Sequence, residues 1–290
     1  MHPAPSVIIF TVFSGLGFGM LAFLGLGFPD VYGLTSFIFF AIAYAMAVGG
    51  LVASTFHLGN PKNAIKAFSQ WRTSWLSREG VASVIALSTM GIYAIGRIFL
   101  EVDWAPLGSL AAVLCILTVF TTSMIYAQLT TVPRWNHWNT PLLLLSFSIA
   151  GGALMTGQIK IAVIGFVVSA IAQILAWAMG DKRFSERGST IETATGLGRI
   201  GSVRQFEGPH TGTNYLLKEM VHVVGRKHAM KLRAIGFVLA FILPAFLLWI
   251  SVSHAMAIFV VLSHVAGVIV LRWLFFAEAE HVVGLYYDKR

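Results

Sequence analysis

Residues 33–79 read GLTSFIFFAIAYAMAVGGLVASTFHLGNPKNAIKAFSQWRTSWLSRE, and they decide the fold class because a polar link follows directly on an apolar run. The run 33–56 carries no charge, and about 20 apolar residues in a helix cross a bilayer core of ~30 Å. The link 57–79 holds a histidine, a glutamate and four basic side chains. Such groups are costly beside lipid unless they have a function or a partner. We therefore look for function in this link.

The rest of the 290-residue chain repeats the apolar pattern. Hydrophobic residues make up 57% and charged residues 11%, the mean hydropathy is +0.79, and soluble domains carry ~25% charged residues. These runs are too long and too continuously apolar for barrel strands. We predict an all-α, polytopic integral membrane helical bundle, a single membrane domain over 1–290. Its eight transmembrane helices are expected at about 6–28, 33–56, 80–100, 107–128, 140–157, 159–179, 234–252 and 255–276.

Cysteine usage and the start of the chain limit the chemistry. Cys115 is the only cysteine and falls inside the fourth run, which excludes internal disulfides and thiolate-held iron–sulfur clusters within this chain. The start, MHPAPSVIIF, has no basic segment before its long apolar run, so a cleaved signal peptide is not expected. Any redox metal is expected in another subunit.

The net charge of +8 is a topology signal, because the basic residues divide by side of the membrane. With both termini and the even-numbered loops on one face, 18 of the 20 lysines and arginines lie on that face, and Arg97 and Lys160 lie on the other. Basic loops face the cytoplasm. We expect a multi-pass protein of the bacterial inner membrane with both termini and the 57–79 link in the cytoplasm.

The segment 180–231 is the longest piece outside the apolar runs. It mixes glycine, serine and threonine with charge, a composition typical of a loop. Its end, NYLLKEMVHVVGRKHAMKL, places apolar residues at a helical spacing with basic residues after them. We expect a long cytoplasmic loop that contains an interfacial amphipathic helix.

Small residues recur inside the apolar runs, at GLGFG (15–19), at Gly49 with Gly50, and at Gly151 with Gly152. Small residues let helix backbones approach closely in lipid. We expect these glycines to serve packing and not ligand binding.

His57 and Glu79 are the two groups of the link best suited to proton transfer. His57 lies where the second apolar run ends, and it could donate a hydrogen bond or a proton to a quinone carbonyl. The alternative is an interfacial histidine bonded to a backbone carbonyl. Glu79 is expected in the first turn of the third helix, where it could simply complement the helix dipole. If it faces His57, the two form a carboxylate–imidazole proton relay.

The link after the fourth run is a second candidate region. Tyr126 could hold the far side of a quinone ring, whereas Trp135 and Trp138 are expected to be interfacial belt residues. Histidines also raise the possibility of a b-haem. No pair of them lies at matching depth on two inward faces by any pattern, and His264 is expected to be a hydrogen-bonded bundle histidine.

Two motifs carry a resemblance to a known family. FHLGNPKNAIKAF followed by LSREG, and then TVPRWNHWNTP after the fourth run, resemble the membrane anchor subunit of the dimethyl sulfoxide reductase family across all eight spans. The resemblance implies a quinone site at His57 and a functional acidic residue at Glu79. It also implies partner subunits that carry molybdopterin and iron–sulfur clusters, with no catalytic residue and no metal in this chain. We take the quinone-binding residues to be His57, Gly59, Asn60, Arg78, Glu79 and Tyr126.

The predicted orientation selects a branch of that family. A cytoplasmic link resembles the quinone-linked sulfite dehydrogenase branch, so we expect electrons to pass from cytoplasmic sulfite oxidation to ubiquinone or menaquinone. Arg78 or Lys62 would then stabilise the reduced quinone. The alternatives are an anchor that oxidises menaquinol for a dimethyl sulfoxide reductase, a b-haem cytochrome, and a small transporter, which would need broken helices or ionisable groups at the midplane.

Overall fold

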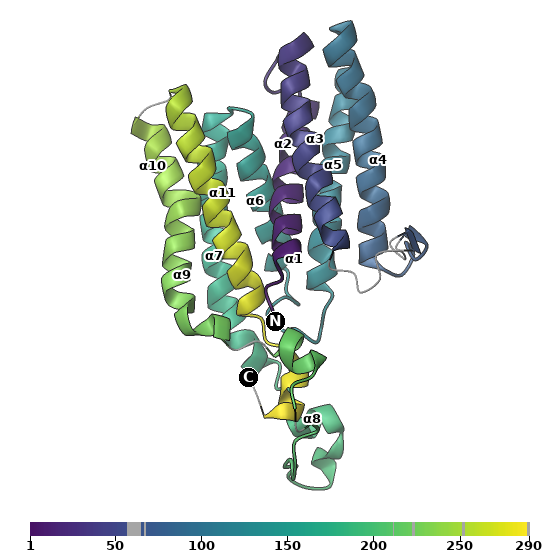
Figure 1. Ribbon diagram of the computed structural model, residues 1–290, viewed down its shortest axis with the longest axis vertical. Helices are drawn as coiled ribbons and strands as arrows, with labels where there is room; N and C mark the ends of the chain where they lie inside the picture. Colours follow the sequence, from purple (N-terminus) through teal and green to yellow (C-terminus); the bar gives the residue numbers. More distant parts are fainter. Residues whose placement is uncertain (57–64, 67, 211, 222–223, 251–252, 289–290) are drawn as a thin grey trace.

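The computed structural model describes residues 1–56, 65–66, 68–210, 212–221, 224–250 and 253–288, and within these ranges every regular element is helical. Seven helical segments of the described residues are long and apolar enough to cross a membrane. The eighth predicted span is α6, Asn139–Met155, which is shorter at 17 residues and runs alongside the others (Figure 1). The all-α membrane bundle is confirmed, and the count of eight is approximate.

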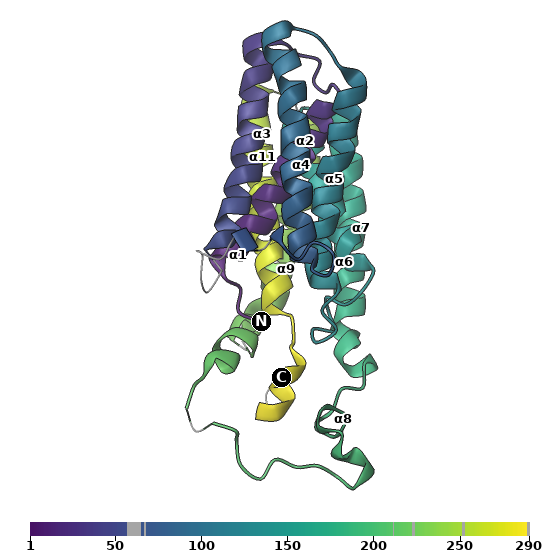
Figure 2. The same ribbon diagram turned by 90° about the vertical axis from the view of Figure 1, so that its right-hand side faces the viewer.

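The spans alternate in direction through the chain. The first consists of α1 (Pro5–Ile9), a π-helical turn η1 (Phe10–Ser14) and α2 (Gly15–Gly25). The others are α3 (Gly33–Thr55), α4 (Trp75–Ile95) continued by η3 (Gly96–Leu100), α5 (Ala105–Ala127), α6, α7 (Ile159–Glu186), α9 (Ala229–Phe237) continued by η7 (Val238–Ile242) and α10 (Leu243–Ile250), and α11 (His254–Ala277). Both termini lie at the same end of the bundle as α8 (Ile191–Thr195), which we call the loop end (Figures 1 and 2).

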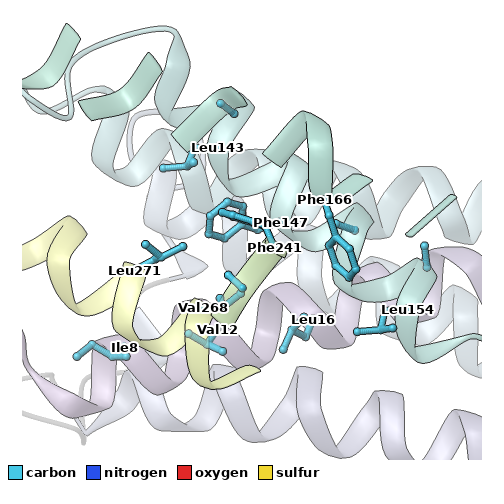
Figure 3. Packing of buried hydrophobic residues seen from close by; sticks show 14 of the residues in the cluster. Ile8, Val12, Leu16, Leu143, Phe147, Leu154, Phe166, Phe241, Val268 and Leu271 are labelled. Atoms are coloured by element: carbon cyan, nitrogen blue, oxygen red, sulfur yellow. The ribbon is translucent and has the colours of Figure 1, made fainter. Parts of the chain in front are cut away.

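The first span is the centre of the bundle. In its most apolar window 78% of the residues are buried, against 28% in α3. One of its faces packs with α3, α4 and α5, and the other packs with α6 and α11; residues of α7 and η7 complete the buried cluster on that second side. Val12 and Leu16 of this span belong to one buried cluster with Phe147 of α6 and Val268 of α11 (Figure 3). A span enclosed by other helices must be apolar all round, which its sequence is.

Glycines at 19 and 152 allow α2 and α6 to cross in close contact. A Cβ atom at Gly19 would overlap the carbonyl of Ser148, and one at Gly152 would overlap the carbonyl of Gly19. The packing prediction is confirmed here, and Gly17 and Gly50 contact backbone of neighbouring helices in the same way. At Gly49 a Cβ atom would meet nothing within 4 Å, so packing does not explain that residue.

The loop segment is more irregular than the sequence pattern suggested. It contains α8 and the short turns η4 (Leu197–Arg199), η5 (Leu216–Met220) and η6 (Val224–His228), and η8 (Val282–Tyr287) packs against it. Residues 222–223 lie outside the described ranges. The continuous interfacial helix therefore stays a prediction.

Candidate functional site

Glu79 is a buried carboxylate inside the bundle. It is 4% exposed, and its Oε1 accepts a hydrogen bond of 2.5 Å from Oγ1 of Thr122 on α5. The helix begins at Trp75, earlier than expected, and its first turn contains no acidic residue. The expectation that Glu79 lies in the first turn is thus wrong. The extended backbone ends at Ser74, so the helix starts four residues before Glu79, and the Glu79 side chain points toward α5. Complementing the helix dipole does not account for its position, since that effect fades beyond the first turn.

Thr122 can serve Glu79 in either protonation state. Its hydroxyl lies 2.5 Å from the Glu79 carboxylate and 3.0 Å from the carbonyl oxygen of Thr118. A hydroxyl has one proton to donate and lone pairs that accept. It can donate to an ionised Glu79, or it can donate to Thr118 while it accepts a hydrogen bond from a neutral Glu79. The pair is therefore built to tolerate loss and gain of a proton at Oε1.

Tyr126 lies one turn beyond Thr122 on α5 and belongs to an aromatic cluster. Its ring packs edge-on at 5.4–5.6 Å from Trp135, Phe275 and Phe276. Trp135 is 2% exposed, stacks on Phe275 and donates from Nε1 to its carbonyl oxygen. The expectation of an interfacial Trp135 is wrong, because that backbone carbonyl satisfies its indole N–H inside the bundle. Trp138, at 59% exposed, fits the belt.

Arg78 faces away from this buried cluster. Its Nε donates to the carbonyl oxygen of Trp71 at 3.0 Å, its Nη2 donates to that of Arg72 at 2.7 Å, and its guanidinium lies 4.3 Å from the centre of the Trp75 ring. These contacts hold the segment before α4 against the start of that helix. Phe68 of the same segment covers Gly80, where a Cβ atom would lie 3.0 Å from its ring.

The remaining predicted quinone-binding residues, His57, Gly59 and Asn60, lie outside the described residues, as does Lys62. The described part of α3 ends at Thr55. Of the predicted quinone-binding residues that the structure describes, Glu79 and Tyr126 lie close enough to interact electrostatically. The relay between His57 and Glu79 stays a prediction.

Arg272 is a buried group that sequence reasoning missed, because it was counted among the charges of the cytoplasmic face. It lies inside α11 and is 3% exposed, and its guanidinium is 5.1 and 5.5 Å from the ring centres of Phe147 and Phe275. Its Nε has no hydrogen-bond partner in the described part of the chain. Together with Thr122 it lines a cavity of about 10 Å³. An arginine inside an apolar run was the signal that could have found it.

Comparison with known proteins places the chain in a family. Residues 1–277 match the family described as DMSO reductase anchor subunit (DmsC). The chain belongs to this family. It is also 31% identical to one of the subunits of the sulfite dehydrogenase of Allochromatium vinosum, over 100% of its own length and 99% of that protein. No solved structure matches. The chain is thus a multi-pass membrane anchor subunit of an oxidoreductase complex.

The far end of the anchor subunit has its own charge cluster. Arg97 is 2% exposed, pairs with Asp30 at 2.8 Å and with Asp103 at 3.5 Å, and lies over the ring of Tyr32 at 3.9 Å. One of the two basic residues on this face is therefore neutralised locally. This is consistent with the uneven distribution of charge that predicted the orientation.

At the loop end, ion pairs join the ends of several helices of the anchor subunit. Asp181 of α7 and Glu278 at the end of α11 each pair with Arg134 and with Arg233 of α9. Arg134, which lies in the TVPRWNHWNTP motif, thus has a structural role. The four side chains form a closed ring of alternating charge that fixes the ends of three spans against each other.

The described residues offer no evident place for a metal ion. No group of three or more histidine, cysteine and acidic side chains among them could hold one. His264 is 1% exposed, and its Nδ1 lies 2.8 Å from the carbonyl oxygen of Ala240. It is the hydrogen-bonded bundle histidine that was predicted. The absence of metal and haem from this chain stays a prediction.

Proposed function

We propose that this anchor subunit reacts with quinone and passes electrons from a sulfite-oxidising partner to the quinone pool. The observation that carries the proposal is Glu79, a carboxylate buried about one helical turn below the loop end and hydrogen-bonded to Thr122. An ionisable side chain in such a position is expensive and is usually functional. The full-length similarity to a sulfite dehydrogenase subunit supports the sulfite-oxidising partner.

The described residues supply proton handling and an apolar surface. A bound quinone would take up two electrons and two protons. Glu79 would release and take up a proton at its carboxylate, and the Thr122 hydroxyl would orient that carboxylate in both states. Ile65, Phe68 and Phe56 expose apolar side chains around the start of α4 and the end of α3, and these suit an isoprenoid molecule arriving from lipid. His57 is the proposed second proton donor.

The roles of Arg78 and Tyr126 are revised by their contacts. Arg78 positions the segment before α4 through two backbone carbonyls, and its direct contact with a quinone oxygen remains a proposal. Tyr126 is held by three aromatic rings, so we propose that it forms the rigid inner wall behind Glu79. Gly59 and Asn60 are retained as proposed binding residues.

We propose that the partners dock at the loop end, on the cytoplasmic face. A molybdopterin catalytic subunit and an iron–sulfur subunit would bring electrons to the end of the bundle that holds Glu79, both termini and α8 (Figure 1). The uneven distribution of lysine and arginine supports this orientation. Molybdopterin and clusters would remain in the partners.

The proton role is tested by Glu79→Gln in the whole complex, with Glu101→Gln as a matched control at the other end. Glu101 is an exposed carboxylate beyond η3. Each variant is assayed for sulfite-dependent reduction of a ubiquinone analogue and for sulfite-dependent reduction of a soluble dye. We expect the Glu79 variant to lose at least about ten-fold in the quinone assay, in line with general acid–base catalysis, and to keep its dye activity. Equal quinone rates in both variants would refute the role of Glu79.

Orientation is tested by cysteine labelling. Cys115 is buried, so single cysteines can be introduced with little background. Ser69→Cys at the loop end and Lys160→Cys at the far end are both exposed. With a membrane-impermeant maleimide, intact spheroplasts should label only the Lys160 variant, and inverted vesicles only the Ser69 variant. The opposite pattern would place the loop end outside the cell.

The family match keeps a second function open. An anchor of the DMSO reductase type would draw electrons from menaquinol instead of delivering them to quinone. Purified complex assayed for sulfite oxidation with a quinone acceptor, and for sulfoxide reduction with a menaquinol analogue, separates the two. We expect the first reaction, and the second one alone would favour the alternative.

A further inference from the structure

Arg272 carries a positive charge deep inside the loop-end half of the bundle. It lies five residues before the end of α11, Thr122 lies five residues before the end of α5, and Glu79 lies four residues after the start of α4. At ~1.5 Å of rise per residue, all three are about 6–8 Å below the loop end. Guanidinium groups stay protonated in proteins. The charge therefore lies at the same depth as the proposed proton-handling carboxylate.

Few of the titratable groups around Arg272 could supply the negative charge that balances its guanidinium. From α4 and α5 the titratable groups are Glu79 and Tyr126, and Tyr126 is close enough to interact electrostatically with both Glu79 and Arg272. Toward the loop end, Glu278 is already paired with two other arginines. Two turns toward the membrane centre, His264 bonds a backbone carbonyl. Among the described residues, Glu79 is thus the buried carboxylate that no arginine already pairs with.

A small cavity with several hydroxyl-bearing residues in its lining lies beside Arg272 and Thr122, the partner of Glu79. Its volume is about 10 Å³, and Thr11, Ser14, Thr122 and Ser148 are among its lining residues. A cavity of ~10–15 Å³ with two to four polar partners is enough for one water molecule. The hydroxyls of Ser14 and Ser148 donate to backbone carbonyls, which leaves their oxygens able to accept from a water or from the guanidinium.

We propose that Arg272 is a positioning residue for Glu79, acting through a water held in this cavity and through Thr122. The proposal rests on the proposed function of Glu79. The fixed positive charge favours the ionised carboxylate, and the water and the Thr122 hydroxyl link the two by hydrogen bonds. Arg272 does not touch the quinone in this arrangement. It sets the pH range in which Glu79 can exchange its proton.

The test compares pH profiles of the quinone-linked rate in the whole complex. As an order of magnitude, an opposite charge ~10 Å from a carboxylate, at an effective dielectric constant of about 20, shifts its titration by about one pH unit. Arg272→Met should raise the pH midpoint by about that much. The rate above the wild-type midpoint should then rise up to about ten-fold, because Glu79 keeps the proton that it donates, and the rate well below the midpoint should not change. Arg272→Lys keeps the positive charge, so its pH midpoint should stay close to that of the wild type. Lys160→Met removes an exposed positive charge at the far end and should shift nothing.

A second variant tests the cavity and leaves the charge in place. Val268 lines the cavity one turn from Arg272, and Val268→Leu should fill it and lower the quinone-linked rate several-fold. Dye-linked activity should stay normal in every variant. The proposal is overturned if Arg272→Met keeps the wild-type pH midpoint, or if Val268→Leu keeps the wild-type rate. It is also overturned if neither arginine variant assembles, because Arg272 would then be structural.

The outcomes also separate this proposal from the function on which it rests. If Glu79→Gln abolishes quinone coupling while Arg272→Met leaves the pH midpoint unchanged, only the role of Arg272 fails. If Glu79→Gln has no effect on quinone coupling, the proposed function of the carboxylate itself fails.

Discussion

Two identical substitutions, Gly152→Ala and Gly49→Ala, should change the stability of this anchor subunit in opposite directions. At Gly152 a Cβ atom would lie 2.8 Å from the backbone nitrogen of Met20 and closer still to the carbonyl of Gly19. These are backbone atoms of the central span, so relief requires α2 and α6 to separate. At Gly49 the added methyl group would meet nothing within 4 Å.

The magnitudes follow from overpacking and helix propensity. Inserting a methyl group into a tightly packed interior costs about 1–3 kcal/mol, and we expect Gly152→Ala to cost that much in the free energy of unfolding. Replacing an unhindered glycine in a helix with alanine gains about 0.5–1 kcal/mol, and this is the expected gain at Gly49. The two variants should therefore differ by about 1.5–4 kcal/mol.

Thermal unfolding of the purified complex in detergent, followed by circular dichroism, measures the difference. For proteins of this size about 1 kcal/mol corresponds to a Tm change of roughly 2–4 °C. Gly152→Ala should have a Tm several degrees below that of the wild type, and Gly49→Ala should equal or exceed it. Equal Tm values for the two variants would refute the close crossing of α2 and α6.

Three further predictions concern the polar groups. Arg97→Ala should cost about 2 kcal/mol, because it removes a buried cation, and Asp30→Ala under about 1, since that carboxylate is 76% exposed; equal Tm losses would contradict this. Burial lowers the pKa of His281, so its neutral form stabilises the fold above its unfolded pKa of about 6.5 and this contribution is lost as the pH falls. In limited proteolysis, the C-terminal segment should then be cleaved faster at pH 5 than at pH 7.5, and His281→Gln should remove this difference in cleavage rate. Thr122→Val should lower both Tm and the quinone-linked rate by leaving Glu79 without its donor, at a cost of about 1–3 kcal/mol, whereas Thr122→Ser should stay near wild type; equal losses would contradict the hydrogen bond.

The sequence was sufficient for the spans because hydrophobic burial in lipid leaves a direct signature. Apolar runs of sufficient length predicted the helices to within a few residues, and α6 was found although it is short. The largest shift is at the end of α7, which runs to Glu186 and not to about residue 179. The start of α4 also shifts, to Trp75, although the apolar run starts near residue 80. The polar residues at the start of α4 are helical because Ser77 and Glu79 are buried against the bundle. No local sequence pattern reveals this burial.

The candidate site was only partly accessible from sequence. Glu79 was identified because it is a carboxylate near a membrane edge, but its bond to Thr122 joins residues 43 positions apart. Arg272 was misplaced because sequence counting cannot distinguish a charge at a helix end from one turned inward one turn earlier. Trp135 was misplaced for a related reason, since its hydrogen bond to Phe275 spans 140 positions.

The most direct test of the quinone site is photo-crosslinking of the whole complex with an azidoquinone, followed by peptide mapping. We predict labelling between the end of α3 and the start of α4, or on the Thr122–Tyr126 face of α5, with competition by ubiquinone or menaquinone analogues. Labelling confined to α9 and α10, or labelling that the analogues do not reduce, would contradict a quinone site at Glu79.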